Sequence, residues 1–208
     1  MNFELIKPFF FSFTFFLLAQ LHKLMSIQNE LLKEKIHTKA HAMEITDYAC
    51  ASEKNFKEVL QCFLSNEYRL QQRAAWSISW AARKKPEMIM PYIKDLVAQL
   101  NRTDVHDAVI RNCVRVLEAI DIPKKFHGEV MNACFNFIES PSAPIAIKAF
   151  SLTTLFNLCK IYPEIKPELK LIIQERWQHE TAAFKSRGRK ILEQLGNCSP
   201  ALPTSSSS

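Results

Sequence analysis

Small and apolar residues recur at one helical spacing, i, i+4, i+7, i+8 and i+11, in four segments of the chain. This spacing places the five residues of each segment on one face of an α-helix. The four predicted faces are Leu70, Ala74, Ser77, Ile78 and Ala81; Val109, Cys113, Val116, Leu117 and Ile120; Ile145, Ala149, Leu152, Thr153 and Phe156; and Phe184, Gly188, Ile191, Leu192 and Leu195. The second residue of each face is small, and these small residues are 39, 36 and 39 positions apart. A period of this length predicts stacked helix pairs.

A proline follows each of the first three faces and precedes a second amphipathic segment. Pro86, Pro123 and Pro163 suit the first turn of a helix, where a missing N–H group costs no hydrogen bond. The second helices are expected over Ile93, Leu96, Val97 and Leu100; over Phe126, Val130, Cys134 and Phe137; and over Ile165, Leu169, Ile172, Ile173 and Trp177. The repeating unit is therefore predicted to be helix, proline turn, helix.

An earlier copy and several helix ends complete the pattern. The residues of the earlier copy are Thr38, Ala42, Ile45, Thr46 and Ala49, followed by a second helix over Phe56, Val59, Leu60 and Phe63. Ser52 is expected to cap that second helix, and Thr103 or Asp104 the helix that carries Val109. Gly196 is expected to end the last helix.

These elements predict an all-α fold, a right-handed solenoid of antiparallel helix pairs with about four repeats and a capping helix. The repeat domain is expected over residues 25–196, between a Phe-rich leader over 1–24 and a Ser/Pro-rich disordered tail over 197–208. The chain has 3 glycines, too few for a Gly-rich phosphate loop or a dinucleotide fingerprint.

The runs Gln72–Ile78, Arg111–Leu117 and Lys148–Phe150 each place a basic or polar residue before small and aliphatic positions. This pattern resembles HEAT repeats, the paired-helix units of armadillo-like solenoids, as found in small bacterial HEAT-like proteins. The resemblance covers most of the chain. It implies a binding or scaffolding role along one solenoid face, with a protein partner, and only rarely an enzyme.

The N-terminal segment leaves two interpretations open. Phe9 to Leu18 is almost wholly apolar, with Lys7 before it and Ala19 after it, which is typical of a signal peptide. The alternative is that Met25 is the true start and that the upstream residues are a misplaced leader. The segment is short for a membrane span, which needs about 20 apolar residues. We expect a cytoplasmic protein in the second case and an exported one in the first.

The cysteines favour the cytoplasm. Cys62, Cys113, Cys134 and Cys159 lie within predicted helices, and no CxxC pair or zinc-ligand spacing occurs. A buried free cysteine behaves as a small apolar residue, whereas secreted chains more often pair their cysteines.

Candidate catalytic and metal-ligating residues are few. His37, His41 and Glu44 could share a helix face at metal-ligand spacing, but a fourth ligand is absent, which favours a solvated face. Asp104 and Asp107 flank His106, where a cap and a polar turn explain them. Asp121 suits the turn before Pro123. The sequence therefore indicates no catalytic residue, no metal site and no cofactor.

Positive charge offers a second hypothesis, because the formal net charge is +6. The candidate contacts are Arg83, Lys84, Lys85, Lys124, Lys125, Lys185, Arg187, Arg189 and Lys190. Clustered cations with tryptophans are typical of nucleic-acid binding, since cations release counterions from phosphate and rings stack on bases. Trp76 and Trp80 are similar to features of bacterial DNA alkylation repair glycosylases, although no aspartate lies near them. The alternative is that these cations complement helix dipoles and are solvated.

Overall fold

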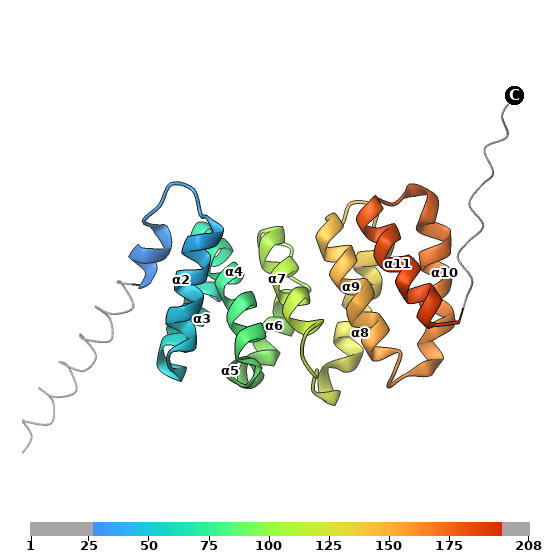
Figure 1. Ribbon diagram of the computed structural model, residues 1–208, viewed down its shortest axis with the longest axis horizontal. Helices are drawn as coiled ribbons and strands as arrows, with labels where there is room; N and C mark the ends of the chain where they lie inside the picture. The colour runs from blue at the N-terminus through green and yellow to red at the C-terminus, as the bar shows by residue number, and fades with distance from the viewer. Residues whose placement is uncertain (1–26, 197–208) are drawn as a thin grey trace, which may run out of the picture. The chain divides into compact units, whose positions relative to one another are not determined.

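The computed structural model describes residues 27–196, and within this range the chain is helical with no β-strand. The chain divides into two compact units, Met1–Met88 and Ile89–Ser208. Figure 1 shows the helices in chain order. The predicted leader over 1–24 and the predicted tail over 197–208 lie outside the described residues, so both remain predictions.

In the first unit a short helix over 27–32 precedes three longer helices, α2 (Lys39–Cys50), α3 (Glu53–Phe63) and α4 (Tyr68–Lys84). The short α5 (Pro86–Ile89) crosses the division between the units. The second unit contains η1 (Met90–Tyr92), α6 (Ile93–Gln99), α7 (Asp107–Leu117), η2 (Lys124–Phe126), α8 (His127–Glu139), α9 (Ile145–Leu158), η3 (Pro163–Ile165), α10 (Lys166–Arg176), η4 (Trp177–His179) and α11 (Ala182–Gln194). The helix–proline–helix order predicted from the sequence is confirmed along the described chain.

The first unit is built on the face predicted for α4. All five residues of this face, from Leu70 to Ala81, are buried, and α4 packs against both α2 and α3. Two buried hydroxyl groups, one on α2 and one on α4, bind backbone carbonyls. Thr46 Oγ1 lies 2.7 Å from the Ala42 carbonyl oxygen, and Ser77 Oγ lies 3.2 Å from the same oxygen. The Thr46 bond lies within α2, whereas the Ser77 bond joins α4 to α2, and both satisfy buried hydroxyls.

In the second unit α9 packs against α7, α8 and α11 (Figure 1). Four of the five residues of the face predicted for α11 are buried, namely Phe184, Gly188, Ile191 and Leu192, whereas Leu195 is half-buried just beyond the helix. A Cβ atom built on Gly188 would lie 3.0 Å from Ile173 Cγ2 and 3.4 Å from the Trp177 ring. The glycine therefore allows α11 to approach the helical segment over 166–179 closely.

The face predicted for α9 is partly wrong. Ile145 is 51% exposed, and Thr153 and Phe156 are only half-buried. The buried residues instead include Ile147, Ser151, Leu152, Thr154, Leu155 and Leu158. A helix that contacts four others, α7, α8, α10 and α11, buries more than one stripe, so a five-residue template cannot place its core.

Helix ends agree with the sequence except at α7. Ser52 caps α3 by accepting a hydrogen bond from Asn55 N at 3.1 Å, and Gly196 has φ 80° after the end of α11. The expected cap of α7 at Thr103 or Asp104 is wrong. His106 is the N-cap, and its Nδ1 accepts from Ala108 N at 2.9 Å. Asp104 instead pairs with Arg102, 2.6 Å from its Nη2.

Candidate functional site

A polar residue directly precedes the small residue of each of the five faces. We name this the core polar position; its occupants are His41, Arg73, Asn112, Lys148 and Arg187. Arg187 is half-buried and the other four are buried. Burying a polar or charged group is costly unless it is hydrogen-bonded or paired. The partners of these side chains therefore show which helices the buried polar groups connect.

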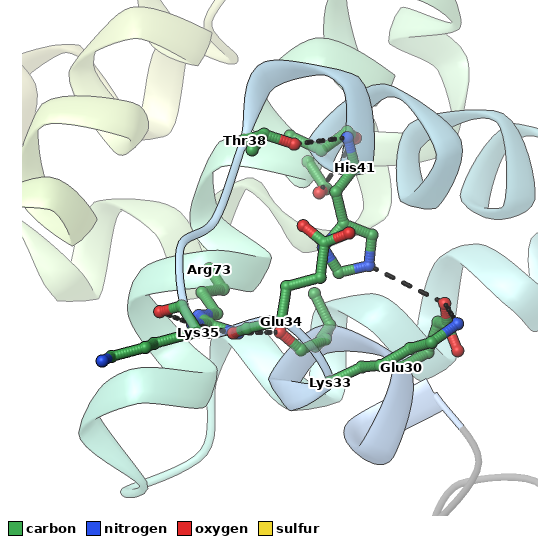
Figure 2. A network of polar contacts seen from close by, with 10 residues as sticks. Glu30, Lys33, Glu34, Lys35, Thr38, His41 and Arg73 are labelled. Atoms are coloured by element: carbon green, nitrogen blue, oxygen red, sulfur yellow. Dashed lines mark hydrogen bonds and ion pairs between the residues drawn. The ribbon is translucent and has the colours of Figure 1, made fainter.

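Arg73 holds the N-terminal segment. Its guanidinium donates hydrogen bonds to the carbonyl oxygens of Leu31 at 2.6 Å, Glu34 at 2.7 Å and Lys35 at 3.2 Å (Figure 2). These carbonyls lie at and just beyond the end of the helix over 27–32, where the last carbonyls have no partner within the helix. The arginine of α4 thus caps that helix.

His41 lies between two carboxylates of the same segment. Its Nε2 lies 3.9 Å from Glu30 Oε1, and its Nδ1 lies 3.9 Å from Glu34 Oε2. Figure 2 shows His41 above the segment that carries both glutamates. One carboxylate approaches each ring nitrogen of the imidazole without forming a hydrogen bond to it.

His37 packs against aromatic rings. Its ring centroid lies 5.3 Å from that of His41 and 5.6 Å from that of Trp76, both edge-on. Burial, with the neighbouring His41 and Arg73 charges, lowers the pKa of His37 to about 4. The expectation of a solvated face is therefore wrong for His37 and His41, whereas Glu44 is exposed. Among residues 27–196 no group of histidine, cysteine or carboxylate side chains could hold a metal ion.

Arg187 joins three helices of the second unit, α7, α9 and α11. Its Nη1 lies 2.9 Å from Glu118 Oε2, 2.9 Å from the Ala149 carbonyl oxygen and 2.8 Å from Thr153 Oγ1. The expectation that this charge is solvated and available to a partner is wrong. Because α11 packs on α9, the guanidinium reaches across α9 to the residue that ends α7.

Lys148 and Glu180 form a buried ion pair. Lys148 Nζ lies 2.6 Å from Glu180 Oε1, and Arg176 Nε lies 2.9 Å from the same oxygen. Burial raises the pKa of the Glu180 carboxyl, but the hydrogen bonds from Lys148 and Arg176 outweigh it, so the pKa lies below its ordinary value. This cluster ties the turn after α10 to α9.

The remaining predicted cations differ in their surroundings. In the first unit Arg83 is exposed, Lys84 pairs with Asp47 at 2.7 Å, and Lys85 Nζ donates to the Cys50 carbonyl oxygen at 2.7 Å. In the second unit Lys124 and Lys125 are exposed on η2, and Lys125 Nζ lies 4.9 Å from the centroid of the Phe126 ring.

In the second unit α11 places three of these cations together on an open surface. Lys185, Arg189 and Lys190 line an open depression along its outer face, together with Ala182, Ser186 and Glu193. The structure thus brings three of the predicted α11 cations together and uses the fourth, Arg187, inside the fold.

The described cysteines are structural. Cys50, Cys62, Cys113, Cys134 and Cys159 are free and buried. Burial raises the pKa of the Cys62 and Cys134 thiols to about 12. A thiol with a raised pKa is a poor nucleophile, because the thiolate is the reactive form.

The chain matches the family model of the HEAT repeat domain over residues 22–195. The chain belongs to the HEAT repeat family. No curated protein and no solved structure matches it. The helical architecture of the described residues agrees with a HEAT-like fold. Within residues 27–196 no helix has the length and apolar character that crossing a membrane requires.

Sequence reasoning missed the partners of the core polar position. Glu118, Thr153 and Glu180 lie 69, 34 and 32 positions from the side chains they bind, so no local motif connects them. The signal that could have found the position itself is a polar residue beside the small one in every face.

Proposed function

We propose that this HEAT repeat protein is a noncatalytic scaffold or adaptor that binds a protein partner along one face of its helices. The observation that supports the proposal most strongly is that Arg73, Lys148 and Arg187, side chains able to carry chemistry, instead connect helices within each unit. Helix surfaces are then what the described chain offers to other molecules. HEAT repeats commonly present such surfaces for binding.

One such surface is the outer face of α10. Leu171 is 54% exposed there, on the opposite side of the helix from the buried Leu169 and Ile173. Glu168 and Glu175 flank it and are exposed. An apolar side chain between two carboxylates suits a partner that presents an apolar residue beside basic ones.

Photo-crosslinking from position 171 in the cells that make the protein tests this proposal. We expect a crosslinked protein, whose purified form binds the wild type at least about tenfold more tightly than Leu171→Asp, because a charge replaces an apolar contact. The matched control is Ser186→Asp, an exposed change on α11, which should leave the affinity unchanged. Crosslinks to nucleic acid alone, or equal affinities for wild type and Leu171→Asp, would contradict the proposal.

The second candidate function is nucleic-acid binding, and the cations of α11 are the observation that favours it. Lys185, Arg189 and Lys190 share one open surface, so they could contact successive phosphates. The outer face of a terminal helix in a repeat protein is also commonly polar for solubility, which explains the same residues without a ligand. We therefore place this candidate second.

We also propose a cytoplasmic location. The free, buried thiols within residues 27–196 support it, because they suit a reducing compartment. Mass spectrometry of the native protein should then find these thiols unmodified. Disulfide bonds between them would contradict the proposal.

A further inference from the structure

We propose that residues 27–38 form a proton-sensitive latch on the first unit, closed at neutral pH and released in mild acid. The latch is held by three kinds of contact. Ile27 and Leu31 are buried, at 4% and 0% exposure. The Arg73 guanidinium binds three latch carbonyls, and the His37 imidazole packs against Trp76 (Figure 2 shows the Arg73 part).

His37 is the proton-sensitive group of the latch. Both of its ring nitrogens are buried and make no hydrogen bond with the described residues. A neutral imidazole tolerates this environment, whereas a buried imidazolium without hydrogen bonds does not. Adding a proton to His37 therefore disfavours the closed latch.

The charged groups around His37 come from three elements. The charges of Arg73 of α4 and His41 of α2 oppose a positive charge on it, whereas the backbone of Arg73 and the Glu34 carboxylate of the latch favour one. Glu34 is also 3.9 Å from His41 Nδ1, and Glu30 is 3.9 Å from His41 Nε2 and 3.3 Å from Lys33 Nζ. The latch carboxylates thus also contact His41 and Lys33, and the Arg73 guanidinium remains a cationic neighbour of His37.

The direction of the pH effect follows from the two states of His37. In the closed latch its pKa is about 4, and in a released, solvated segment it returns to 6.5. Between these values the released form binds more protons than the closed form, so acid favours release. The stabilisation of the closed latch is complete above about pH 6.5 and is lost as the pH falls toward about 4.

Release would change the surface of the first unit. The Trp76 ring would lose its contact with His37, and Arg73 would lose its three carbonyl partners. An aromatic ring and a guanidinium of α4 would then be open to solvent. The latch is a property of the isolated chain, so its test does not depend on the proposed protein partner.

Hydrogen exchange of the full chain at about pH 7 and about pH 5 tests the latch. After correction for the intrinsic pH dependence, we expect exchange of amides in 27–36 to accelerate on the order of tenfold at the lower pH. Amides of α8 in the second unit are the internal reference and should not change. Equal protection of 27–36 at both pH values would overturn the proposal.

Two variants identify the group responsible. His37→Phe keeps a ring against Trp76 and removes the titratable nitrogens, so its 27–36 amides should show less than a twofold change between the two pH values. His179→Phe removes an exposed histidine and should behave as the wild type. If the phenylalanine at 37 prevents folding, judged by circular dichroism, His37→Gln makes the same test. A pH response that survives removal of the imidazole would overturn the proposal.

Discussion

At the residue scale, the core polar position decides how neighbouring helices are joined. Buried or half-buried polar side chains occur there in all five faces, yet each described partner set is different. Arg73 binds backbone carbonyls, Lys148 binds a carboxylate, and Arg187 binds both kinds of group. A buried charge whose partner is removed costs several kcal/mol, so these contacts specify the packing even where they add little net stability.

Glu180→Gln should destabilise the protein by about 3 kcal/mol, because it leaves the buried Lys148 ammonium without its counterion. Urea unfolding at neutral pH measures the change. The exposed pair of Asp104 with Arg102 provides the control, and Asp104→Asn should have no measurable effect.

The same variant makes a prediction about pH. The pKa of Glu180 is lowered in the folded protein, so its contribution is present above its ordinary value of 4.5 and is lost as the pH falls below it. The difference in unfolding free energy between wild type and Glu180→Gln should therefore shrink in acid. A difference that stays constant down to about pH 3 would show that the carboxylate is not the stabilising group.

Gly188→Leu should cost about 1–3 kcal/mol, because even a Cβ atom there lies 3.0 Å from Ile173 Cγ2. Ser186→Leu, an exposed change two positions away on the same helix, is the matched control and should cost far less. Thermal unfolding of both variants decides the matter. Equal melting temperatures would mean that α11 does not dock through Gly188.

At the element scale, the sequence predicts helices best where one face is apolar. The face of α4, and that of α11 as far as Leu192, are predicted correctly because the opposite sides of these helices carry polar residues such as Arg69 and Arg189. The face of α9 is misplaced because the helix contacts four others and has apolar residues on most sides. The cap of α7 was missed because histidine is not among the preferred N-cap residues.

The cap of α7 can be tested directly. His106→Ala should destabilise the protein by about 1 kcal/mol, because Ala108 N loses the acceptor that caps the helix. Thr103→Ala, at the exposed position predicted from the sequence, should leave the unfolding free energy unchanged. If the two substitutions have the reverse effects in urea, Thr103 rather than His106 is the cap.

At the scale of the whole molecule, the cations behind the formal net charge of +6 contact several different elements. Lys84 and Lys85 contact α2 within the first unit, and Arg187 contacts α7 and α9 within the second. The candidate nucleic-acid contacts could be found from the sequence as cations. That Lys84, Lys85 and Arg187 bind groups within the fold could not be found from the sequence, because each partner lies more than 30 positions away. The open surface on α11 brings together three of the candidates in the described second unit.

The measurement that tests the scaffold account most directly is the affinity of the purified protein for nucleic acid as a function of salt. Fluorescence anisotropy with short single strands and duplexes serves, using the wild type and the variant in which Lys185, Arg189 and Lys190 become glutamate. We predict no binding by the wild type near physiological salt, because the cations are divided among separate helices. Submicromolar binding by the wild type that falls steeply with salt would contradict the scaffold account if the variant weakens it. The slope of log affinity against log salt concentration should then be smaller in the variant by about one for each lost phosphate contact.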